Sequence, residues 1–107
     1  MIVGAAVVEL RLHACRSLKQ KRGIVRSITR RVRNRFNVAV AEVGGQDKWQ
    51  VAMLGLSAAG SDARVVRRVL DAASRYVEDL HLAEVVCVDV ELVDLPHHES
   101  PLEEDDA

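Results

Sequence analysis

The sequence predicts a single α+β domain in which strands and helices follow the order β-α-β-β-α-β. Three observations predict it. Four stretches have the composition of strands, two stretches repeat apolar residues at helical spacing, and a chain of 107 residues is long enough for one modest core. An apolar content of 49% and a charged content of 29% are typical of a globular protein.

The first half of the chain is predicted as a strand, a helix and a second strand. Residues 2–13 alternate with a period of two, and the even positions are expected to face the core: Gly4, Ala6, Val8, Leu10 and Leu12. Ser17 followed by Gln20 is typical of a capping box and predicts a helix from about residue 18 to residue 35. The apolar residues of that helix fall within one arc of a helical wheel: Leu18, Ile24, Val25, Ile28, Val32 and Phe36. Residues 37–43 are predicted as the second strand.

The second half is predicted as a strand, a helix and a strand. Residues 44–47 predict a turn, residues 48–58 a third strand, and residues 60–62 a break that caps a second helix. Residues 84–93 alternate again, with four side chains expected to point inward: Val86, Val88, Val90 and Leu92. This order suits a ferredoxin-like fold, in which two helices cover one face of a four-stranded antiparallel sheet. Right-handed crossovers then place the first and third strands in the centre.

The end of the chain has a different composition. Residues 94–107 hold two prolines and six acids and show no periodicity. We therefore expect one ferredoxin-like domain over residues 1–93, followed by a disordered acidic tail over residues 94–107. The two cysteines, Cys15 and Cys87, are far apart and have no metal-ligand spacing, so we expect both to be reduced.

Positive charge is concentrated in the first predicted helix. Ten of the fifteen Lys and Arg residues lie between Arg11 and Arg35 with no acid among them, whereas eleven of the sixteen acids lie from Glu78 onward. Five basic residues share one face of the helical wheel, called here the basic stripe: Lys19, Arg22, Arg26, Arg30 and Arg33. Together with Lys21 they are the candidate RNA-binding residues, since Arg and Lys bind phosphate oxygens. The alternative is a solvated face whose charges maintain solubility.

The predicted sheet has a second face that no helix covers. Its candidate interface residues are apolar or small: Val7, Val51, Met53, Val85 and Cys87. An exposed apolar sheet face usually marks a contact surface, so a homodimer or a docked protein partner is the second hypothesis. The alternative is that the predicted facing is shifted on one strand.

Polar residues surround the predicted hairpin at residues 44–47. We expect these to form a polar corner: Glu42, Gln46, Asp47, Trp49 and Gln50. Two converging carboxylates would suit acid–base catalysis. Ordinary turn chemistry, with Trp49 as a packing residue, is the favoured interpretation. A corner that recognises a partner is the intermediate interpretation.

Other chemistry finds little support in the sequence. The four His residues show no metal-ligand spacing, the stretch GGQDKW lacks the Lys-Ser/Thr end of a phosphate loop, and no nucleophile has a recognisable base. We therefore expect neither catalytic residues nor a metal or cofactor. No apolar run approaches the roughly 18 residues of a membrane span, and no signal peptide is apparent, so the expectation is a cytoplasmic protein.

The motifs SLKQKR at residues 17–22 and RFNVAVAEVGGQDKWQVAMLG at residues 35–55 resemble the YlxP-like family, a small bacterial family of unknown function. The resemblance covers most of residues 1–93 and implies a ferredoxin-like fold. Genes of this family often lie among translation-factor and ribosome-maturation genes, so the resemblance implies RNA or the small ribosomal subunit as partner. It brings no established activity. Two positions depart from the family pattern, Gly44 where relatives often carry Asp and Val51 where they often carry Arg.

Overall fold

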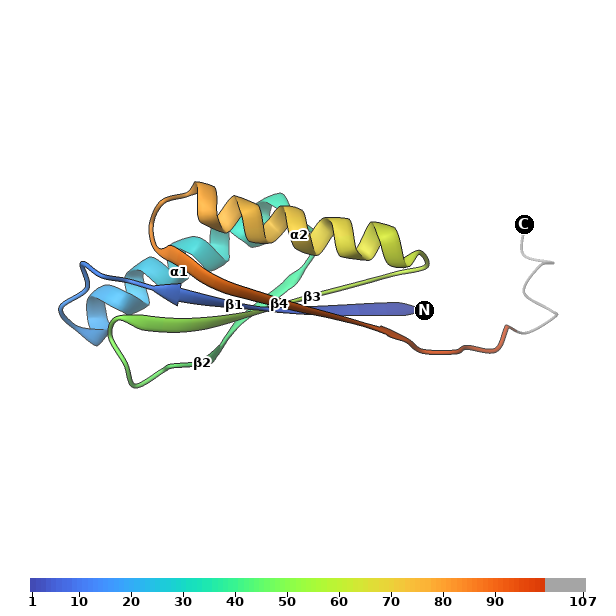
Figure 1. Ribbon diagram of the computed structural model, residues 1–107, viewed down its shortest axis with the longest axis horizontal. Helices are drawn as coiled ribbons and strands as arrows, with labels where there is room; N and C mark the ends of the chain where they lie inside the picture. Colours follow the sequence, from blue (N-terminus) through green and yellow to red (C-terminus); the bar gives the residue numbers. More distant parts are fainter. Residues whose placement is uncertain (100–107) are drawn as a thin grey trace.

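A computed structural model describes residues 1–99 and shows the predicted order of elements in two layers (Figure 1). Both helices lie on one side of a single four-stranded sheet. The elements are β1 (Ile2–Arg11), α1 (Leu18–Arg35), β2 (Ala39–Gly44), β3 (Val51–Gly60), α2 (Ala63–Asp79) and β4 (Glu84–Asp94). The predicted ferredoxin-like α+β fold is therefore confirmed.

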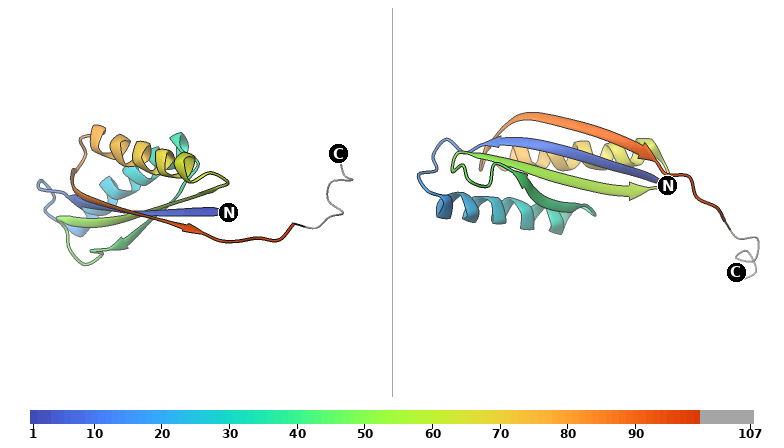
Figure 2. Two further views of the ribbon diagram at one scale, coloured as in Figure 1. Left: turned by 45° about the vertical axis from the view of Figure 1, so that its right-hand side comes forward. Right: turned by 90° about the horizontal axis from the view of Figure 1, so that it is seen from below.

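The sheet is antiparallel throughout, with the strand order β2-β3-β1-β4. β1 and β3 occupy the centre, as right-handed crossovers require. Seen from the open side of the sheet, α1 lies beside β2, while α2 lies behind β1 and β4 (Figure 2). α2 also contacts β3, so the two helices divide the same face unequally.

The core lies between this face and the helices. The even positions of β1 are buried as predicted, and α1 and α2 add a stripe of aliphatic residues each: Val25, Ile28 and Val32 from α1, and Val66, Leu70, Ala73 and Val77 from α2. At Gly4, α2 approaches the backbone of β1 closely. A β-carbon at Gly4 would lie 2.6 Å from Leu70 Cδ1 and 2.7 Å from Val66 Cγ1, so the helix packs directly on the strand backbone.

The helices begin where the sequence predicts. Ser17 Oγ accepts a hydrogen bond from the backbone N–H of Gln20 at 3.2 Å, and Gln20 Oε1 accepts one from the N–H of Arg16 at 2.6 Å. These two bonds form a capping arrangement at the start of α1. Asp62 caps α2 by accepting from the N–H of Arg64 at 2.8 Å.

The strand ends differ from prediction by a few residues. β3 begins at Val51, not at residue 48, because the preceding residues form the hairpin turn, in which the Lys48 N–H donates to the Gly45 carbonyl at 3.0 Å. At the other end of the sheet, β4 includes Asp94, and Leu95 exchanges hydrogen bonds with Met1 at 2.8 and 2.9 Å. Residues 100–107 of the predicted tail lie outside the described residues.

A β-bulge changes the facing of the first part of β4. Glu9 of β1 pairs with Cys87 but Leu10 pairs with Val85, so Val86 is an extra residue without a partner in β1. Val86 is 50% exposed, although a simple alternation places it inward. Val85 packs against the core instead. The prediction that Val85 belongs to the open sheet face was therefore wrong, and the bulge is the physical reason.

Candidate nucleic-acid interface

The basic stripe lies on the β2 side of α1, away from α2. Two contacts establish this orientation. Arg33 Nη2 donates to the Val40 carbonyl in β2 at 2.7 Å, whereas the Arg35 guanidinium lies over the Tyr76 ring of α2, 4.9 Å from its centroid. All five side chains of the stripe are exposed. They form one line of positive charge along the outer edge of the helical layer.

The charge of the basic stripe has no acidic partner within residues 1–99. None of the ion pairs in this part of the chain involves a stripe residue. α2 provides a contrast, because its four arginines are interspersed with Asp71, Glu78 and Asp79, and Arg67 lies 3.9 Å from Asp71. One helix therefore mixes its signs as ordinary surface helices do, and the other carries a single sign.

Lys21 is not part of this exposed surface. Its side chain is 1% exposed, and its ammonium lies 2.9 Å from Glu42 Oε2. It also donates to the carbonyl oxygens of Gly45 and, at 2.7 Å, of Lys48. The expectation that Lys21 lies on the exposed surface with the other candidate RNA-binding residues was therefore wrong. The helical wheel contains the missed signal, because Lys21 falls in the middle of the apolar arc rather than beside the stripe.

The predicted polar corner is dispersed in the structure. Glu42 turns toward Lys21, and its buried Oε2 atom makes an ion pair without the alignment of a hydrogen bond. Gln50 turns the other way, donating to the carbonyls of His13 and Cys15 at 3.3 and 3.2 Å. Gln46 donates weakly to the Glu42 carbonyl at 3.4 Å, and Asp47 is exposed. Glu42 and Asp47 therefore do not converge into an acid–base pair.

The open face of the sheet holds four of the five residues predicted for it. Strand register places Val7, Val51, Met53 and Cys87 on this side, opposite the helices. A depression of about 400 Å³ lies over Gly55 of β3, between β1 and β2. It is lined by Ala5, Val7, Ala41, Val43 and Ser57, among others. The β4 margin is acidic, since Asp89 and Glu91 pair with Val7 and Ala5 on the same face.

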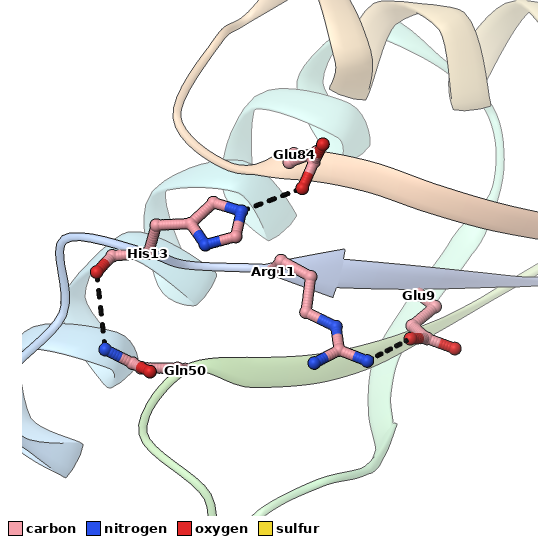
Figure 3. A network of polar contacts seen from close by, with 5 residues as sticks. All are labelled: Glu9, Arg11, His13, Gln50 and Glu84. Carbon is pink, nitrogen blue, oxygen red and sulfur yellow. Dashed lines mark hydrogen bonds and ion pairs between the residues drawn. The ribbon is translucent and has the colours of Figure 1, made fainter.

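Two further depressions meet where the β1–α1 and α2–β4 connections come together. Their volumes are about 560 and 570 Å³, and they share Ala14, Cys15 and Ile24. On the rim, His13 Nε2 lies 2.8 Å from Glu84 Oε1, and Gln50, the residue before β3, donates to the His13 carbonyl (Figure 3). His13 and Glu84 are 71 positions apart, so the sequence carried no signal for this pair. Within residues 1–99 no group of three His, Cys, Asp or Glu residues is placed to hold a metal ion.

The fold and its surfaces define a small ferredoxin-like α+β domain with a basic helix on one edge and an open sheet face. The chain belongs to the family described as "Protein of unknown function (DUF503)", which matches residues 3–90. The resemblance found in the sequence motifs is thereby confirmed.

One curated relative supports this assignment, and one designed structure is similar in fold. The chain is 32% identical to "Uncharacterized protein YlxP" from Bacillus subtilis (strain 168) over 77 residues, which cover 72% of this chain and 84% of the relative. The structure is similar to "De novo designed protein Foldit4", with a TM-score of 0.51 and 15% identity, over 90% of this chain and 100% of the designed one. The second likeness concerns the fold alone. In the described part of the chain, neither helix has the length and apolarity to cross a membrane.

Proposed function

We propose that this protein is a cytoplasmic, non-catalytic domain that associates with RNA or the ribosome through the basic stripe of α1. The stripe offers an extended row of guanidinium groups and one ammonium group, and guanidinium forks hold pairs of phosphate oxygens. Such contacts follow the nucleic-acid backbone and carry no direct information on base sequence.

The proposal depends on one observation: the exposed face of α1 carries positive charge and no acidic residue. Arg22, Arg26 and Arg30 are spaced four residues apart, and like charges at this spacing repel by a few tenths of a kcal/mol per pair. No acid within residues 1–99 pairs with them to offset this repulsion. The arrangement disfavours the isolated helix and favours an anionic partner that neutralises it.

Charge reversal on α1 tests the proposal. Arg22→Glu/Arg26→Glu/Arg30→Glu should weaken binding to structured RNA and to purified small ribosomal subunits, measured across a salt series. If about four phosphates are contacted, log affinity of the wild type falls with log salt at a slope of about −3 to −4. The variant should lose about three units of that slope, because each lost phosphate contact removes about one.

The matched control is Arg64→Glu/Arg68→Glu/Arg75→Glu, which makes the same change in net charge along one face of α2. It should keep the wild-type slope. Equal weakening by both variants would show a response to net charge alone, and no weakening by either would contradict the proposal.

A second candidate function uses the open sheet face as a homodimer interface. The apolar depression over Gly55 favours it, because side chains of a second copy could fill it while burying few polar groups. The two functions use different surfaces and are compatible with each other.

A further inference from the structure

Trp49 stands at the end of the β2–β3 hairpin and is 48% exposed. It is the only tryptophan in a chain whose aromatic content is 3%. Single exposed apolar residues are common on protein surfaces and have no meaning by themselves. The backbone around Trp49, however, is held in place from two sides, which distinguishes it from an aromatic residue on a loose loop.

The first brace comes from the basic helix. Lys21 places its ammonium beneath the hairpin, where it contacts the Gly45 and Lys48 carbonyls and the Glu42 carboxylate. Lys48 directly precedes Trp49. Removing a lysine ammonium from water is costly unless it is paired and hydrogen-bonded, so three polar contacts in one place make a specific clamp. Gly45, with φ of 76°, gives the turn the left-handed conformation that this geometry needs.

The second brace comes from the β1–α1 connection. Gln50, directly after Trp49, donates from its side chain to the His13 and Cys15 carbonyls, and its own carbonyl accepts from the Leu12 N–H at 2.9 Å. Trp49 therefore has a clamped residue on each side. The backbone that carries the indole therefore needs little ordering on binding, and a pre-ordered segment loses less entropy when it meets a partner.

The charge around this hairpin favours a nucleic-acid partner. Lys48 is exposed beside Trp49, and Arg22, in the basic stripe, directly follows the clamping Lys21. Asp47 is the exposed acid of the turn, and Lys48 next to it offsets its charge. An aromatic face next to a basic surface is the combination that proteins use to stack single-stranded bases while holding the backbone.

We propose that Trp49 is a stacking platform for an unpaired base of the same RNA strand that the basic stripe contacts. This inference rests on the proposed function and adds to it a preference for single-stranded over duplex RNA. A base in a duplex is already stacked and cannot lie on the indole, whereas every unpaired base has a free π face.

Tryptophan fluorescence and labelled-RNA anisotropy test the inference in the full chain. A short single-stranded oligoribonucleotide of mixed sequence should quench the Trp49 emission, and the same strand annealed to its complement should not. Trp49→Ala should weaken single-strand binding about tenfold, which is the usual effect of removing one stacking partner. Duplex binding and the salt slope should stay unchanged. Trp49→Phe, which keeps an aromatic face and should fold if the alanine variant does not, should retain most of the single-strand affinity.

Several outcomes would overturn the inference, and they separate it from the proposed function. If Trp49→Phe and Trp49→Ala bind the single strand as tightly as the wild type, stacking is wrong, while a loss on reversal of the basic stripe still supports the proposed function. If Trp49→Ala alters the sedimentation of the protein but not its RNA affinity, Trp49 contacts protein and the inference is wrong. If the wild type binds neither RNA form at low salt, both proposals fail.

Discussion

Lys21 shows how one residue changes role once its surroundings are known. By composition it belongs with the seven other Lys and Arg side chains of α1, but its ammonium lies beneath the hairpin and its side chain is 1% exposed. Its three contacts connect the basic helix to the β2–β3 connection. The shape of the hairpin, and with it the position of Trp49, therefore depends on a charge that never reaches the surface.

Removing this charge should destabilise the protein. Lys21→Met leaves the partly buried Glu42 carboxylate without its partner, so we expect the free energy of unfolding to fall by about 3 kcal/mol in urea titrations. Lys21→Met/Glu42→Met should recover much of the loss, because both charges are then absent. A single variant as stable as the wild type would show that the clamp contributes nothing to folding.

At the scale of the element, β4 shows the limit of predicting strand facing by alternation. The period of two predicts Val88, Val90 and Leu92 on the core side, and these residues pair with core-facing positions of β1. One extra residue at Val86 reverses the pattern before it and moves Val85 to the core side. A bulge depends on how two strands pair, so the sequence of one strand does not reveal it.

Alanine substitutions at two glycines should change the stability of the protein in opposite directions. Gly23 lies in α1, where a β-carbon added to it would have no neighbouring atom within 4 Å, so Gly23→Ala should raise the free energy of unfolding by about 0.5–1 kcal/mol through helix propensity. Gly4→Ala should lower it by about 1–3 kcal/mol, because the added methyl group overlaps Leu70 and Val66 of α2. Thermal or urea unfolding of the two single variants measures both changes in the free energy of unfolding. Equal changes in the two variants would contradict this account of the packing.

At the scale of the whole molecule, the fold places opposite charges on opposite edges. In the sequence, the basic and acidic residues are only concentrated in different parts of the chain. α1, with eight basic residues and no acid, lies beside β2, and β4, with four acids and no basic residue, forms the opposite edge of the sheet (Figure 2). For the proposed RNA partner, this polarity would direct the basic helix toward the phosphates and the acidic edge away from them.

The second candidate function predicts that the protein forms a homodimer through the open sheet face. If it is a homodimer interface, the wild type should sediment as a dimer, and Val7→Arg should make it monomeric, because the substitution places a charge beside the depression over Gly55. Val86→Arg is the matched control, since Val86 is similarly exposed but stands at the bulge of β4. A wild type that remains monomeric over the full concentration range would remove the dimer hypothesis and leave the RNA proposal intact.

The sequence by itself determined the order of the elements, the core side of β1, the start of α1 and the presence of a one-signed basic helix. These features depend on periodicity, capping and composition, which are local properties of the chain. Only the tertiary structure decided that Lys21 is a buried clamp, that Val85 joins the core, and that Glu42 and Gln50 face different neighbours. Each of these depends on which segments distant in the chain meet in space, and such meetings are set by packing and strand register rather than by any local pattern.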